Sequence, residues 1–284
     1  MRPTAATALV AALREDIDRL LAAEPDVRAD VEDSVHQMRV ATRRLRSVLR
    51  SYRRLFDAEQ TAATLTELKW LADLLGVARD AEVRAARFKD LLRGYDEVPV
   101  EVVRALVGAS RHVYATAHAE ILTALDEPRY RELAEVLTTW RTDPPLAATA
   151  ASSDAATAFD RVLRRDRTRA RRLVLSEPTA TPADRVELLH DIRKSAKRLR
   201  YSCEAASTVL GEQATDLGAR AKRLQTVLGD HRDAVESREA ILAAAATTPG
   251  AATLFELLAD TEEAAAGRAL ARYPAAAAFI TGTA

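Results

Sequence analysis

The chain has 284 residues, of which 48% are hydrophobic and 30% charged, and this composition excludes a generally disordered protein. Its 42 basic and 42 acidic residues cancel, so the net charge predicts no polyanionic partner, and the single cysteine, Cys203, excludes an internal disulfide and a cysteine metal cluster. No apolar run approaches 18 residues, so no membrane contact is expected and the cytoplasm is the expected location.

Strong helix formers fill the chain between its prolines, and no alternating Val/Ile/Thr segment indicates a strand. The sequence therefore predicts an all-α protein. The predicted helices before residue 142 cover 5–23, 31–56, 58–76, 79–94, 99–126 and 128–141. After a Pro/Ala/Ser-rich loop at 142–154, the predicted helices cover 155–175, 183–209, 212–228, 231–246 and 251–272.

Two motifs each occur twice, in the same order. VHQMRVATRRLRS (35–47) aligns with LHDIRKSAKRLRY (189–201), giving H-x-x-R-x-x-x-R/K-R-L-R at an offset of 154. LKWLADLLGVARDAEV from Leu68 and AKRLQTVLGDHRDAV from Ala221 share K-x-L-x-x-x-L-G-x-x-R-D at an offset of 153. The chain is therefore predicted to be one domain over 1–284, built as a duplicated helical unit. The expected first repeat covers about 5–141, the linker 142–154 and the second repeat about 155–275.

The first motif predicts two cationic stripes. At 100° per residue its basic side chains fall within about 80° on one side of a helix, opposite an apolar side. The stripe residues are His36, Arg39, Arg43, Arg46 and Arg50 in the first copy and His190, Arg193, Lys197 and Arg200 in the second. Arginine forks bind phosphate with paired, charge-assisted hydrogen bonds, which favours a phosphate ligand. The alternative is that the stripe pairs with acids inside the protein, such as those of residues 254–263.

The second motif suggests helix ends. Gly76 and Gly229 fit the left-handed residue that follows a helix C-terminus. Asp80 and Asp233 would then lie in the first turn of the next helix, where capping is the expected role. The alternative is that they hold a basic neighbour or a stripe arginine in place.

Further basic residues extend the candidate surface. Lys69 and Lys222 begin the second motif, where an antiparallel helix would bring them beside the stripe. A third basic cluster, RVLRRDRTRARR from Arg161, places Arg161, Arg165 and Arg172 on one side of a helix and is a further candidate for this surface.

These paired motifs, in a duplicated all-helical chain of this length, resemble the CHAD domain, the conserved histidine α-helical domain. The resemblance covers about residues 5–275. It implies two helical bundles related by an internal pseudo-two-fold axis, whose basic helix sides line a central channel or surface that binds inorganic polyphosphate. Family members are often fused to a triphosphate-cleaving CYTH domain. The E-x-E-x-K motif of that domain is absent here, so a stand-alone protein is expected.

The resemblance implies a set of polyphosphate-binding residues. Arg44 and Arg198 flank the stripes, whereas Arg50 and Arg84 have Glu204 and Ser237 as counterparts, so the two halves are not identical. The expected ligand-binding residues are His36, Arg39, Arg43, Arg44, Arg46, Lys69, Arg79, His190, Arg193, Lys197, Arg198, Arg200, Lys222 and Arg232.

The leading hypothesis is a non-catalytic polyphosphate-binding protein, without cofactor or metal, that associates with polyphosphate granules. One alternative is a phosphohydrolase or phosphotransferase that uses histidine, but no P-loop and no carboxylate cluster for Mg²⁺ accompanies the histidines. The other alternative is a nonspecific nucleic-acid binder. Aromatic residues make up only 5% of the chain, so platforms for base stacking are scarce and nucleic acid is the less expected partner.

Overall fold

The computed structural model describes residues 3–282, and the all-α prediction is confirmed over this range. Its only β-contacts there are two isolated bridges, Thr4–Asp154 and Phe56–Leu146. The helices before residue 142 are α1 (Ala5–Ala22), α2 (Glu24–Arg28), α3 (Ser34–Ser51), η1 (Arg53–Leu55), α4 (Ala58–Leu92), α5 (Val100–Val103), η2 (Arg104–Gly108), α6 (Ala109–Asp126) and α7 (Pro128–Trp140). The later helices are α8 (Ala148–Ser152), α9 (Ala155–Ser176), η3 (Glu177–Thr179), α10 (Pro182–Leu210), α11 (Glu212–Ala245), α12 (Ala252–Ala271) and α13 (Tyr273–Thr281).

Two predicted helix breaks are wrong. The helices predicted at 58–76 and 79–94 form the single helix α4, and those predicted at 212–228 and 231–246 form α11. Gly76 and Gly229 therefore lie inside helices, and neither has a positive φ. A helical glycine costs only about 1 kcal/mol relative to alanine, which the packing of these long helices offsets. Capping by Asp80 and Asp233 is wrong for the same reason, because both lie inside helices.

Smaller differences concern short elements that the sequence did not reveal. The predicted linker 142–154 contains the short helix α8. The predicted helix 31–56 begins only at Ser34, after Asp33 takes a left-handed φ of 64°, and ends at Ser51. The last helix, α13, carries a proline in its first turn. Backbone N–H groups in the first turn have no hydrogen-bond partner inside the helix, so proline is tolerated there.

One hydrophobic core joins the two predicted repeats. Helix α1 buries Leu9, Leu13 and Ile17 against side chains from both halves of the chain. The Tyr52 ring lies 4.7 Å from that of Phe159, and the Tyr52 hydroxyl donates a 2.9 Å hydrogen bond to the Ser202 carbonyl. The halves therefore pack on one another. The repeat boundaries and a pseudo-two-fold axis remain predictions.

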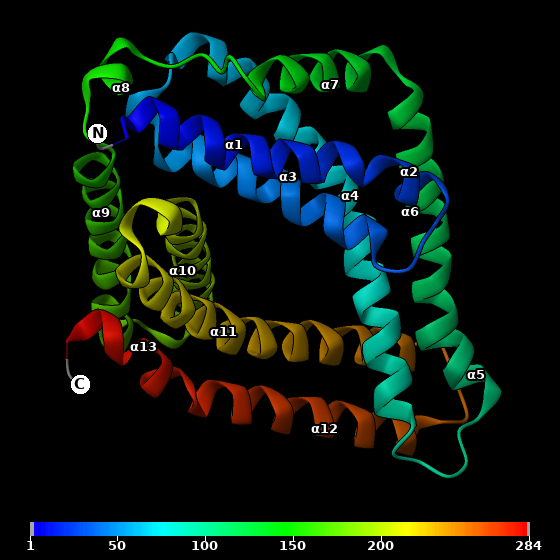
Figure 1. The fold of residues 1–284 in the computed structure, drawn as a ribbon. Coiled ribbons are helices and arrows are strands. Elements are labelled where there is room, and N and C mark those ends of the chain that lie inside the picture. The colour runs from blue at the N-terminus through cyan, green and yellow to red at the C-terminus, as the bar shows by residue number, and fades with distance from the viewer. Residues whose placement is uncertain (1–2, 283–284) are drawn as a thin grey trace.

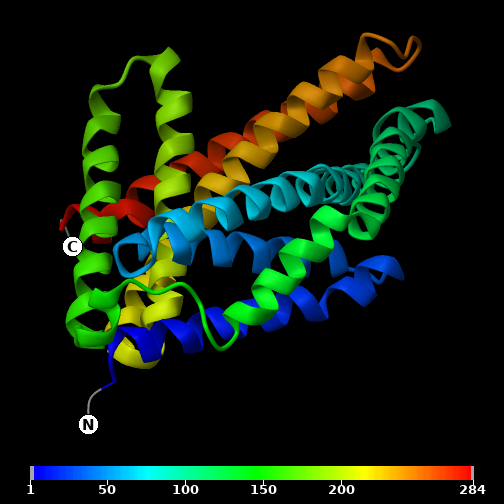
Figure 2. The ribbon, with the colours of Figure 1, turned by 90° about the horizontal axis from the view of Figure 1, so that it is seen from above.

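This packing frames the region between α3–α4 and α10–α11 (Figures 1 and 2). Helix α3 contacts both α4 and α10, and α11 packs along α10 and α12. At the distal ends of α4 and α11 a second cluster joins them, in which Phe88 and Leu92 pack with Ile241 and Phe255. Among residues 3–282, no helix has the length and apolar character needed to cross a bilayer.

Candidate anion-binding site

The stripe helices α3 and α10 bury their apolar sides as the sequence predicts. Met38 and Leu45 of α3, and Ile192 and Leu199 of α10, are all at most 1% exposed. The opposite sides of the two helices are therefore left facing the space between them and the long helices α4 and α11. This places the basic stripes where the fold leaves a cleft.

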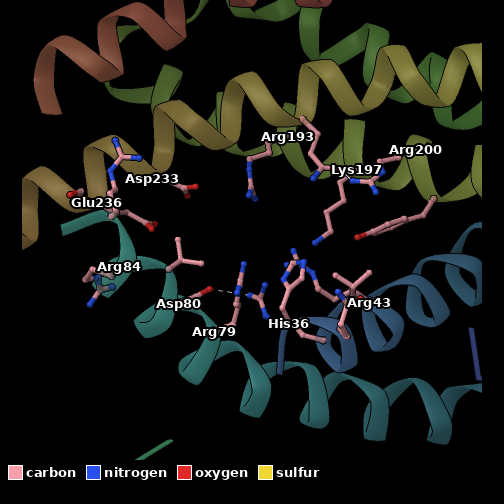
Figure 3. Close-up of a pocket in the computed structure, with 18 residues that line it drawn as sticks. His36, Arg43, Arg79, Asp80, Arg84, Arg193, Lys197, Arg200, Asp233 and Glu236 are labelled. Carbon is pink, nitrogen blue, oxygen red and sulfur yellow. Dashed lines mark hydrogen bonds and ion pairs between the residues drawn. The ribbon is translucent and has the colours of Figure 1, made fainter. Parts of the chain in front are cut away.

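The main cleft has a volume of about 390 Å³ and lies between α3, α4, α10 and α11. Figure 3 shows Arg193 and Lys197 on one side of it, with His36 and Arg43 on the other. The charged residues that line it are His36, Arg39, Arg43, Arg79, Asp80, Arg84, Arg87, Arg193, Lys197, Arg200, Asp233 and Glu236. Seven of the predicted ligand-binding residues are thus brought together: His36, Arg39, Arg43, Arg79, Arg193, Lys197 and Arg200.

Several stripe cations have no acidic partner. Within the described chain, Arg43, Arg46, Arg193 and Lys197 form no ion pair within 4.0 Å, although each is half-buried. Burial, and then the neighbouring Arg39, lower the pKa of Arg43 to about 10. Burial also lowers the pKa of Arg46 and Arg193. Cations that are partly desolvated and unpaired raise the free energy of the empty site, and a bound anion relieves this cost.

The acids of residues 254–263 do not neutralise the stripes. The Glu262 carboxylate accepts hydrogen bonds from Arg87 of α4 and from the Ser237 hydroxyl, and Glu263 pairs with Arg238 at 3.2 Å. None of these acids forms an ion pair with a stripe cation in the part of the chain described. The alternative of internal pairing is therefore wrong for these acids.

The two motif glycines lie directly against stripe arginines. A Cβ atom at Gly76 would meet Arg39 Nε and Nη2 at 3.6 Å, and one at Gly229 would meet Arg193 Nε and Nη2 at 3.5 and 3.6 Å. Asp80, one turn after Gly76, pairs with Arg39 at 3.3 Å. The contact between glycine and arginine thus occurs in both halves, so the glycine of the second motif packs against the arginine of the first motif.

We expect Gly76→Ala to stabilise the protein and keep its ligand affinity, whereas Gly76→Leu displaces the Arg39 guanidinium. A Cβ at 3.6 Å is an ordinary contact, and alanine in a helix interior gains about 0.5–1 kcal/mol over glycine. Losing one charge-assisted contact weakens binding about ten-fold. Thermal melting and polyphosphate titration measure the two effects. Gly267→Leu is the matched control, because Gly267 is helical with open space around it. Wild-type affinity in Gly76→Leu contradicts this role.

Burial and neighbouring cations favour the neutral form of the two motif histidines. Burial, followed by the charge of Arg79, lowers the pKa of His36, and burial followed by Lys194 lowers that of His190. His36 lines the main cleft, and its Nδ1 atom is buried without a hydrogen-bond partner. His190 does not line the cleft, and its Nδ1 accepts a 3.1 Å hydrogen bond from Arg232. A neutral ring with Nδ1 as acceptor donates from Nε2.

Other predicted residues lie outside the main cleft. Lys69 pairs with Asp73 at 2.6 Å on the surface, and Lys222 is exposed. Arg232 pairs with Glu236 and His190 beside the cleft. Arg161, Arg165 and Arg172 of the third basic cluster line neither this cleft nor the hollow next to it, whereas Arg169 of the same segment lines that hollow.

The flanking arginines have buried acidic partners. The Nε of Arg44 donates 2.7 Å to the buried Asp16 carboxylate of α1, and its Nη1 lies 2.8 Å from Glu204. Arg198 lies 3.4 Å from Asp166 of α9, which is 2% exposed. Arg44 is therefore directed away from the cleft, whereas Arg198 and Arg46 line a neighbouring hollow. The two contacts hold each stripe helix against the first helix of its half.

The buried carboxyl of Asp16 is expected to make the free energy of unfolding depend on pH. Burial raises the pKa of its carboxyl from 3.8 to about 6, although Arg44 opposes this shift. The folded state therefore binds this proton more tightly than the unfolded state, so the contribution of Asp16 to stability is fully present below about pH 4 and is lost as the pH rises to about 6. The loss is at most about 3 kcal/mol. Urea denaturation of wild type and Asp16→Asn between pH 4 and 7 measures it, and parallel curves for the two proteins contradict this assignment.

Several lining residues were missed because the long helices were broken at their glycines. Arg84 and Arg87 follow Gly76 on one side of α4, at i+8 and i+11. Gln225, Asp233 and Glu236 lie at i−4, i+4 and i+7 from Gly229 on α11. A continuous helix through each glycine places all of them on the cleft side. Among residues 3–282 no group of three or more His, Cys, Asp or Glu side chains has the arrangement to hold a metal ion.

The helix arrangement and the cleft define an all-helical domain with a cationic site between its long helices. Residues 11–242 match the family model of the CHAD domain, and the chain belongs to the CHAD domain family.

Two relatives and two solved structures are similar to the chain. It is 38% identical over 264 residues to the uncharacterized proteins Rv2226 and MT2285 of two Mycobacterium tuberculosis strains, covering 89% of this chain and 50% of each relative. The chain thus spans about half the length of these curated relatives. The fold is similar to that of PptA from Streptomyces chartreusis, with a TM-score of 0.80 and 20% identity over 96% of this chain and 99% of that one. It is also similar to the CHAD domain from the plant Ricinus communis, with a TM-score of 0.70 and 23% identity over 98% and 92%.

Proposed function

We propose that the protein binds inorganic polyphosphate in the main cleft and does not chemically change it. The observation that carries this proposal is the group of half-buried cations without acidic partners, Arg43, Arg193 and Lys197, which face one another across the cleft. Membership in the CHAD family supports the same ligand. We place the bound protein in the cytoplasm, on polyphosphate granules, as part of this proposal.

The proposed binding energy is electrostatic. A polyphosphate chain brings closely spaced negative charges to a site whose cations are partly desolvated, and it releases its condensed counterions on binding, as nucleic acids do. Arginine guanidinium groups form paired hydrogen bonds to phosphate oxygens, and neutral His36 donates one more. Affinity therefore falls steeply as salt concentration increases.

Catalysis is not part of the proposal, because the acids of the cleft are placed beside cations. Asp80 pairs with Arg39, and Glu236 pairs with Arg232. His36 lies next to Arg79 and Arg39, which disfavour its protonation and repel a metal cation. Release of orthophosphate from polyphosphate in the presence of Mg²⁺ would instead support the hydrolase alternative.

Nucleic acid fits the cleft less well. Among residues 3–282, the one Phe, Tyr or Trp side chain that lines it is Tyr201, which is 5% exposed and has Arg200 over its ring at 5.3 Å. A base therefore finds no open stacking surface. Titration calorimetry with polyphosphate, and competition by single-stranded DNA at physiological salt, test the proposal. Equal affinity for the two polymers favours the nucleic-acid alternative, and no binding of polyphosphate overturns the proposed function.

A further inference from the structure

The outer side of α9 carries exposed arginines that line neither the main cleft nor the hollow next to it. At 100° per residue, four of them fall within about 100° on one side of the helix: Arg161, Arg164, Arg171 and Arg172. Arg164 pairs with Asp160 at 2.6 Å, and the other three form no ion pair within 4.0 Å among residues 3–282. Leu175 lies on the same side of the helix and is 48% exposed. These four arginines and Leu175 form the basic face of α9.

The outer side of α12 has the opposite charge. Residues 239–263 contain five acids and no basic residue. The exposed acids of α12 fall within about 60° on one side of the helix: Glu256, Asp260 and Glu263. Glu263 pairs with Arg238, whereas Glu256 and Asp260 form no ion pair within 4.0 Å in the described part of the chain. Leu257, beside them, is 49% exposed. These three acids and Leu257 form the acidic face of α12.

The basic face and the acidic face do not meet within one molecule. Helix α9 packs its buried side on α10 and α1, and α12 packs its buried side on α11. Figure 1 shows α9 and α12 along different edges of the molecule, and the view from above in Figure 2 agrees. Both faces are therefore open to a partner, and a second copy of the same chain carries the complementary face.

The charge of the whole chain does not oppose contact between copies. Its 42 basic and 42 acidic residues give a net charge of zero, so two copies have no net repulsion at a distance. The helices also match in size, because α9 has 22 residues and α12 has 20, which makes each about 30 Å long. Each face combines unpaired charges with one exposed leucine. Charge, length and apolar character are thus complementary.

We propose that the acidic face of α12 in one copy binds the basic face of α9 in a second copy, so that the protein assembles head to tail. Because the two contacting faces differ, each bound copy keeps one face free, and further copies add to form a chain or a ring. A contact of one helix with one helix belongs among the small, transient interfaces, so assembly depends on protein concentration. Neither face lines the main cleft, which therefore stays open in the assembly.

Sedimentation velocity of the protein without polyphosphate tests this assembly. We expect the weight-average sedimentation coefficient to rise with protein concentration at low salt, and this rise to disappear at about 1 M salt, where the Debye length is about 3 Å. A sedimentation coefficient that does not change with concentration at low salt overturns the inference. Association that is stronger at high salt also overturns it. Because polyphosphate is absent, neither result affects the proposed function.

Two variants distinguish a head-to-tail contact from any other contact between copies. The basic-face variant is Arg171→Gln/Arg172→Gln/Leu175→Gln, and the acidic-face variant is Glu256→Gln/Leu257→Gln/Asp260→Asn; all six positions are exposed. We expect the self-association constant of each variant to fall at least about ten-fold. An equimolar mixture of the two forms a heterodimer and nothing larger, because each variant keeps one intact face.

The matched control is Arg53→Gln/Arg54→Gln/Val136→Gln, which removes two neighbouring exposed arginines and one exposed apolar side chain outside both faces. We expect it to associate like wild type, and circular dichroism verifies that all three variants are folded. Equal loss of association in the control overturns the inference. So does a mixture of folded variants that stays monomeric, or one that forms assemblies larger than a dimer.

Discussion

Replacing Arg39 and Arg193 together by glutamate is expected to abolish polyphosphate binding, a loss of at least about 100-fold, while the protein stays folded. Each guanidinium packs on a motif glycine of the neighbouring long helix, so both are fixed in the main cleft before a ligand arrives. Charge reversal removes two contacts and places two carboxylates beside the phosphates. Titration calorimetry measures the affinity, and circular dichroism verifies the fold.

A matched control separates this local effect from the change in net charge. Arg104→Glu/Arg223→Glu alters the total charge equally, at exposed residues that line neither the main cleft nor the neighbouring hollow that Arg46 and Arg198 line. We expect its affinity at physiological salt to remain within about three-fold of wild type. Retained binding in the folded Arg39/Arg193 variant contradicts the assignment of the cleft as the binding site.

Replacing Asp166 by alanine is expected to destabilise the fold by about 3–5 kcal/mol. The Asp166 carboxylate is 2% exposed and joins three helices. It accepts 2.8 Å hydrogen bonds from the Ser51 and Ser202 hydroxyls and lies 3.4 Å from Arg198 Nε. Without it, Arg198 and Arg165 lose their buried acidic partner and two buried hydroxyls lose a charged acceptor, at the junction of α3, α9 and α10.

Urea denaturation of Asp166→Ala measures this loss. The matched control is Asp160→Ala on the same helix, where the carboxylate pairs, among residues 3–282, only with the largely exposed Arg164. We expect that change to remain below about 1 kcal/mol, as is usual for a surface ion pair. A loss below about 1 kcal/mol in Asp166→Ala contradicts a structural role for this buried carboxylate.

Much of the fold follows from helical periodicity. The spacing of Met38, Leu45 and Leu49 correctly placed one side of α3 in the core, and the same reasoning held for Ile192 and Leu199 of α10. The breaks at Gly76 and Gly229 were wrong because a glycine is compatible both with the end of a helix and with close packing of a neighbouring side chain inside a helix. The packing of Arg39 on Gly76 and of Arg193 on Gly229, which only the structure shows, decides between these two roles.

The site was predictable where its residues share one helix and less so where it depends on tertiary pairing. The stripe order alone indicated that Arg39, Arg43, Arg193 and Lys197 would share a surface, and they line one cleft. The sequence gives no sign that Arg44 is directed to Asp16, because the two residues are 28 positions apart and lie on different helices. The outward position of Lys69 likewise depends on how α4 is rotated against α3.

The most direct test of the central claim is a crystal structure of the protein with a short polyphosphate. We expect one continuous ligand in the main cleft that contacts Arg39 and Arg43 of α3 together with Arg193 and Lys197 of α10. A ligand bound on the outer surface, or to only one of the two stripe helices, would contradict the claim that both motif copies bind a single polyanion.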